Sequence, residues 1–166
     1  MKKTIFTLLL LSGIIVTFVT SCKKEDDDNN NQEFVADDNT FANYTTWTFV
    51  KQEQGASPSL ADAHQGNNAD AVRRIYVNNN ADRGSNSEFP NGTIFLKETK
   101  DAGGNVIEFT AMAKRGGSFN SANKDWEWFM LNPADGKIMD RGANLMGGMC
   151  GGCHSAKASA DYVFSK

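Results

Sequence analysis

Two cysteines and a histidine stand close together near the end of the 166-residue chain, in the order Cys150-Gly151-Gly152-Cys153-His154. This C-x-x-C-H spacing is the attachment motif of a c-type haem. Each thiol can add to one vinyl group of the haem, and the next residue, His154, then lies under the iron as its proximal ligand. The two glycines place no side chain against the porphyrin edge. The motif therefore predicts one covalently bound haem, with its iron, at these residues.

Three other uses of the cysteine pair stay open. A thioredoxin-like redox pair normally follows a strand and opens a helix in a βαβ unit, whereas this motif follows Gly147 and Gly148 without such a unit. A structural zinc site needs four ligands, and the only other histidine is His64. A disulfide suits an oxidising compartment but leaves His154 without a role. Haem attachment accounts for both cysteines and the histidine.

The second axial position of the iron decides what such a haem does. A second His or a Met there would make an electron carrier, whereas an open position would let a small molecule bind. His64 lies in a polar, loop-like stretch, where a lone histidine is expected at the surface. Met112, Met130 and Met139 could reach the distal side, but methionines in strands usually belong to the core. We expect an open or water-filled sixth site.

The first 21 residues predict export. Lys2 and Lys3 precede an apolar run, 5–19, which is short for a membrane-spanning helix of roughly 20 apolar residues and has the length of a signal sequence. The tetrapeptide VTSC then resembles a lipobox, in which Cys22 is lipidated and the chain is cut before it. An uncleaved anchor helix is the alternative. The expected location is lipid-anchored outside the bacterial inner membrane, facing the periplasm or on the outer-membrane surface.

An acidic, asparagine-rich segment, 22–40, predicts a flexible tether. Its start is similar to acidic tags that send lipoproteins to the cell surface, and a plain spacer is the alternative. Residues 1–21 contain two of the 17 basic residues and none of the 20 acidic ones. After their removal, 15 basic and 20 acidic residues give a net charge of −5. An acidic chain without a basic stripe is a poor partner for nucleic acid, because that binding depends on neutralising phosphates.

Residues 41–166 are expected to form the domain that positions the motif. Aromatic residues at helical spacing in 41–47 predict a short opening helix, and residues 52–70 predict a loop. The Ala- and Ser-rich end predicts a helix over 154–161. Alternating or aromatic-rich runs bounded by turn residues predict strands at 72–78, 93–99, 106–114 and 125–131. The expected fold is α+β, an antiparallel β-sheet of four to five strands with flanking helices and a C-terminal haem-attachment helix.

The order of several motifs is similar to that of the cytochrome P-460 family, whose relatives called cytochrome c′-beta share its fold. The motifs are FPNGTIFLKE (89–98), AMAKR (111–115), DWEWF (125–129), CGGCH (150–154) and DYVF (161–164). The resemblance spans roughly Phe41 to the C-terminus. It implies an antiparallel sheet packed on helices, a homodimer and a single five-coordinate c-type haem. Members of the P-460 type oxidise hydroxylamine, whereas c′-beta members bind NO or CO.

The resemblance also implies roles for strand residues. In cytochrome P-460 a lysine is linked covalently to the porphyrin, and the segment NGTIFLKE makes Lys97 the matching residue. Strand alternation places Phe95 on the same face as an apolar lining; a solvent-facing lysine is the alternative. The distal carboxylate of hydroxylamine-oxidising members aligns with Thr110. Glu108, two residues earlier on the same face, is the candidate that would replace it in moving protons, and a surface residue without that role is the alternative.

Together these features predict a mono-haem c-type cytochrome with an open distal iron site. It would oxidise hydroxylamine or a related small nitrogen compound and pass the electrons to a redox partner protein. Lys97, Glu108 and Thr110 are the candidates for that chemistry. Two alternatives stay open: a protein that binds NO or CO without turnover, and an electron-transfer cytochrome with a methionine as sixth ligand.

Overall fold

A computed structural model of the chain describes residues 32–78 and 82–166. The predicted export signal, the predicted lipidation site Cys22 and the first part of the tether, 22–31, lie outside these described residues. Within the two described ranges, no helix is both long and apolar enough to cross a bilayer.

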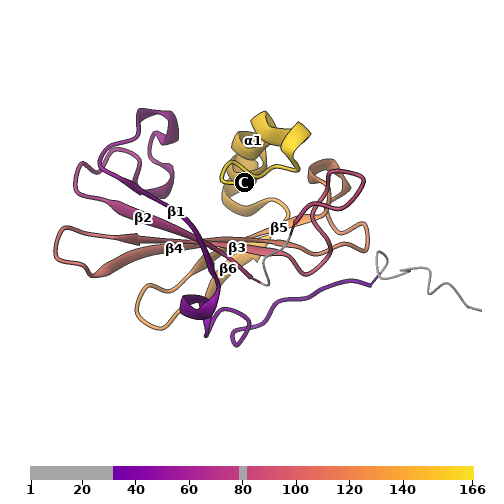
Figure 1. The fold of residues 1–166 in the computed structure, drawn as a ribbon, viewed down its shortest axis with the longest axis horizontal. Coiled ribbons are helices and arrows are strands. Elements are labelled where there is room, and N and C mark those ends of the chain that lie inside the picture. The colour runs from indigo at the N-terminus through magenta and orange to yellow at the C-terminus, as the bar shows by residue number, and fades with distance from the viewer. Residues whose placement is uncertain (1–31, 79–81) are drawn as a thin grey trace, which may run out of the picture.

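The described residues form one six-stranded sheet in which every strand pairs antiparallel with its neighbours in chain order (Figure 1). The strands are β1 (Thr48–Gln54), β2 (Val72–Val77), β3 (Ile94–Lys100), β4 (Val106–Lys114), β5 (Trp126–Leu131) and β6 (Ile138–Gly142). One α-helix, α1 (Met149–His154), follows the sheet. Short 3-10 turns are η2 (Tyr44–Thr46), η3 (Pro58–Leu60), η4 (Ala63–Gln65), η6 (Ser121–Asn123), η7 (Leu145–Gly148) and η8 (Ser155–Ala160).

The α+β class and the antiparallel sheet are confirmed, and the four predicted strands correspond to β2–β5. The two additional strands, β1 and β6, lie at the edges of the sheet. The opening helix predicted at 41–47 is wrong, because that segment contains only the three-residue turn η2. The helix predicted at 154–161 begins earlier, as α1, and continues as the 3-10 turn η8.

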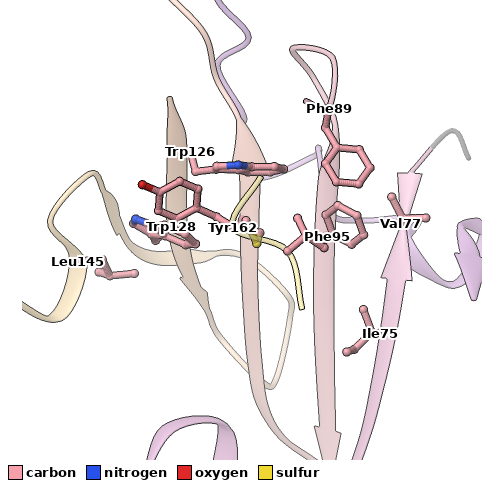
Figure 2. Close-up of a cluster of buried hydrophobic side chains, with 10 residues drawn as sticks. Ile75, Val77, Phe89, Phe95, Trp126, Trp128, Leu145 and Tyr162 are labelled. Carbon is pink, nitrogen blue, oxygen red and sulfur yellow. The ribbon is translucent and has the colours of Figure 1, made fainter. Parts of the chain in front are cut away.

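Both faces of the sheet are covered. We call the face that carries Phe95, Met112 and Trp128 the C-face, because Tyr162 and Val163 of the C-terminal segment belong to the same buried cluster. Figure 2 shows Phe95, Trp128 and Tyr162 in this cluster. The opposite N-face carries a second buried cluster, which the N-terminal segment completes from residues 34–47. In Figure 1 the yellow C-terminal segment and the loop that connects β1 to β2 lie on the same side of the sheet. The C-face is therefore where the haem motif and the β1–β2 loop meet.

A buried carboxylate fixes the C-terminal segment to the C-face. Asp161 has no exposed surface, and its side chain accepts hydrogen bonds from Lys114 Nζ at 2.8 Å, Trp126 Nε1 at 3.2 Å and the backbone N–H of Phe89 at 2.7 Å. Lys114 and Trp126 belong to β4 and β5, so the interaction crosses from the sheet to the segment after the haem motif. Its position determines where Tyr162, the next residue, presents its carbonyl group.

Candidate functional site

The helix α1 carries both cysteines of the motif. A run of left-handed backbone precedes it, with φ of 66° at Gly147 and 88° at Gly148, and glycine adopts this conformation without a steric penalty. Cys150 is half-buried, Cys153 is exposed, and both thiols are free. Burial raises the pKa of the Cys150 thiol. The helix thus presents two unpaired thiols one turn apart, on the same side.

His154 closes the helix with a fixed ring. Its Nδ1 lies 2.7 Å from the carbonyl oxygen of Tyr162. Because a carbonyl only accepts, Nδ1 carries the hydrogen and the neutral ring keeps the lone pair on Nε2. The ring centre lies 4.9 Å from that of Trp128 and 5.3 Å from that of Phe164. Burial lowers the pKa of His154, which favours the neutral form that binds metal.

The strand residues singled out in the sequence share the C-face. Lys97 lies directly opposite Thr110 in the β3–β4 register, and Phe95 lies opposite Met112. Glu108 is two residues from Thr110 and opposite Thr99. Alternation along a strand therefore puts Phe95, Lys97, Glu108 and Thr110 on the face that also carries the haem motif.

Burial shifts the pKa values of two of these residues, Lys97 and Glu108. Burial lowers the pKa of Lys97 to about 8, against the attraction of the carboxylates of Glu53 and Glu108. Burial raises the pKa of Glu108, and the charges of Lys97 and Arg73 oppose this shift. The Lys97 amine also lowers the pKa of His154 and that of His64. Lys97 is therefore a partly buried residue of the C-face, and its role there stays a prediction.

His64 is the residue that the sequence placed incorrectly. It lies in the β1–β2 loop, as expected, but it is not a surface residue: its Nδ1 is 3.1 Å from Thr110 Oγ1. Its ring centre is 6.5 Å from that of His154, and the two ring planes are inclined by 78°. Burial, with the nearby charge of Lys97, lowers the pKa of His64 to about 3, so the ring is neutral at physiological pH.

The candidate methionines lie in different environments. Met112 is buried in the cluster on the C-face, and Met130 packs against that cluster while lying opposite Thr110 in the register. Met139 is 63% exposed on the edge strand β6. Because Met139 is exposed, its side chain lies outside the packed C-face cluster.

A buried arginine positions the loop that carries His64. Arg73 is 1% exposed on β2, and its guanidinium donates to three backbone carbonyl groups of the loop. Nε donates to the carbonyl of His64 at 2.6 Å, one terminal nitrogen donates to that of Gly55 at 2.8 Å, and the other donates to that of Gln65. The sequence offered no sign of this role, because Arg73 stands in an ordinary alternating strand.

The donor set fits a c-type haem. Two free thiols match two vinyl groups, and His154 offers a free Nε2 as an iron ligand. Among the described residues, five buried side-chain atoms lack a hydrogen-bond partner, and two of them, Trp128 Nε1 beside His154 and Glu108 Oε2, lie on the C-face. Buried polar atoms without partners are rare and point to a bound group that completes them. Cys150, Cys153 and His154 are therefore the residues that could hold the haem.

The sequence model of one family, Cytochrome P460, matches residues 41–165. This range contains the whole sheet, the β1–β2 loop and α1. No curated protein matches the chain.

Proposed function

The chain belongs to the cytochrome P460 family, a haem-binding family of cytochromes, and from this premise we propose that it carries a single haem c. Cys150 and Cys153 would hold the haem covalently, and His154 would bind the iron. The observation that carries the proposal is the fixed ring of His154, whose Nδ1 donates to Tyr162 and leaves Nε2 free next to two free thiols. Denaturing electrophoresis tests it: haem staining should migrate with the chain.

We further propose that the site oxidises hydroxylamine or a related small nitrogen compound. A bound haem supplies an iron that can withdraw electrons from such a compound. On the C-face, Glu108 could accept protons, since burial raises its pKa above the usual value of a glutamate. Thr110 and Lys97 would form the polar part of the site, and Phe95 its apolar lining. The electrons would go to a redox partner protein, and a homodimer is the proposed assembly.

Lys97 supplies the test of this finer proposal. A link between Nζ and a porphyrin carbon replaces an N–H and a C–H bond, so an oxidant such as peroxide must take up two electrons and two protons. The neutral amine is the nucleophile, and burial lowers the pKa of Lys97 to about 8, so linking should become faster as pH rises through about 8. A tryptic digest should yield a haem peptide that joins residues 150–154 to the Lys97 peptide, with a red-shifted Soret band.

The matched control for the link is Lys100→Met, because Lys100 lies on the same strand but on the opposite face, where it pairs with Glu98. Lys97→Met should restore an ordinary haem c spectrum and abolish hydroxylamine oxidation, whereas Lys100→Met should change neither. Recovery of the unmodified Lys97 peptide in full yield from a hydroxylamine-oxidising protein would exclude the link.

A second candidate function is electron transfer or gas binding without turnover. The position of His64 opposite His154 favours electron transfer, because two axial imidazoles leave no open position on the iron. NO or CO binding needs the same open iron as hydroxylamine oxidation. The optical spectrum separates electron transfer from the other two functions, since an iron with two protein ligands is low-spin and an iron with one is high-spin.

We also propose that the chain is lipid-anchored through Cys22, outside the inner membrane. The lipobox-like tetrapeptide and the acidic segment behind it support the proposal. Acyl chains add about 0.8 kcal/mol of membrane affinity per buried CH₂, so several chains on one cysteine anchor firmly. Cys22→Ala should give soluble protein or uncut precursor in cell fractionation. Unchanged membrane fractionation with an unchanged mature mass would contradict lipidation.

A further inference from the structure

We propose that His64 is the second axial ligand of the haem iron, bound from the face opposite His154. The inference rests on the proposed haem at Cys150, Cys153 and His154. It replaces the expected open sixth site with a protein ligand in the resting state. The family resemblance implies a five-coordinate iron, so this chain would differ from its relatives at this position.

The separation of the two rings matches joint binding of one metal ion. Two imidazoles that bind one ion through Nε2 from opposite sides, each at about 2 Å, have ring centres roughly 6 Å apart. The ring centres of His64 and His154 are 6.5 Å apart. The two residues are far apart in the sequence, and the fold brings their rings together over the C-face.

The hydrogen bonds of both rings leave the same nitrogen free. The Nδ1 of His154 donates to the Tyr162 carbonyl at 2.7 Å. The Nδ1 of His64 lies 3.1 Å from Thr110 Oγ1, and a threonine hydroxyl can accept a hydrogen bond from it. A histidine that binds metal characteristically donates its other ring N–H to a protein group, which fixes the ring and its tautomer. Both histidines have such a partner.

The loop around His64 is held in a demanding backbone conformation. His64 and Gln65 have φ of 52° and 56°, and Ala61 has φ of 48°. Left-handed backbone is strained for a residue with a Cβ, so it persists only where the surroundings hold it. The buried guanidinium of Arg73 binds the carbonyls of His64 and Gln65. This arrangement holds the imidazole in place before any ligand arrives.

Thr110 has a defined role in this arrangement. The resemblance to cytochrome P-460 aligns Thr110 with a distal carboxylate, and its hydroxyl instead orients a distal imidazole. An added ligand such as NO or hydroxylamine would have to displace His64 before it reached the iron. The resting protein would therefore transfer electrons, and its chemistry with nitrogen compounds would depend on the movement of the His64 loop.

Optical and electron paramagnetic resonance spectra of the haem-loaded protein test the inference. The unchanged protein should be six-coordinate and low-spin in both oxidation states. His64→Ala should convert it to a high-spin form, to which added imidazole restores the low-spin spectrum. Met130→Leu is the matched control, because Met130 lies opposite Thr110 on the same face and is the competing axial candidate; its spectrum should stay low-spin.

His64→Met gives a second test, in which the sixth position of the iron stays occupied by a side chain. Methionine opposite a histidine raises the reduction potential of a haem, so this variant should stay low-spin with a more positive potential. A high-spin unchanged protein, or a low-spin His64→Ala protein without added imidazole, would overturn the inference. Absence of covalent haem from the unchanged chain would instead overturn the proposed function. Covalent haem is measured on denatured protein, so this result does not depend on the axial ligands of the iron.

Discussion

Replacing both Cys150 and Cys153 with alanine is expected to take covalently bound haem from one per chain to none. Both thiols are free and both lie on α1 beside His154, so each can form one thioether with the haem. The double variant should lose its haem to acid–acetone extraction, whereas the unchanged protein, made with a c-type maturation system, should retain it. Each single variant should keep the haem through one bond.

Gly152→Ala is the matched control for this experiment. A Cβ added to Gly152 meets no atom within 4 Å, so the substitution changes the motif without disturbing its spacing or packing. It should retain one covalent haem. Gly151 differs, because a Cβ there would lie 2.9 Å from the amide of Asn123. Haem that extracts freely from the unchanged protein would refute attachment altogether.

The central strands could be predicted from the sequence because they are buried on one or both faces. β4 was predicted with its observed bounds, since turn residues stand at both ends. The edge strands β1 and β6 were missed. β1 reads TFVKQEQ and β6 reads IMDRG, and neither has a run of alternating apolar residues. Edge strands often carry charged residues, which prevent pairing with a further strand. These charged residues interrupt the alternation of apolar residues from which a strand is predicted.

The site could be predicted only where chemistry fixes local spacing. The C-x-x-C-H motif is such a case, and the shared face of Lys97 and Thr110 follows from the strand period of two. His64 could not be placed, because a polar loop has no period and its path depends on a distant residue. That residue is Arg73, whose guanidinium reaches loop carbonyls that no sequence pattern connects to it.

Asp161→Ala is expected to lower the free energy of unfolding by about 3–5 kcal/mol, the usual cost of removing one partner of a buried ion pair. The carboxylate is fully buried and holds Lys114, Trp126 and the backbone of Phe89. Its loss leaves the Lys114 ammonium, which is 4% exposed, with one remaining ion-pair partner among the described residues, the partly exposed Glu88 carboxylate at 3.6 Å. Urea unfolding of the haem-loaded protein measures the change.

The same substitution should also disturb the proposed iron ligand His154, because Asp161 adjoins Tyr162, whose carbonyl accepts the hydrogen bond from His154. With the segment released, the hydrogen bond from His154 Nδ1 to Tyr162 weakens, and the axial imidazole loses its fixed orientation. Asp70→Ala is the control, since Asp70 is an exposed acid, and it should change stability by less than about 0.5 kcal/mol. If Asp161→Ala cost less than about 1 kcal/mol, the buried pair would not be what fixes the C-terminal segment. A loss of stability with an unchanged haem spectrum would show that the segment holds the sheet together but does not orient His154.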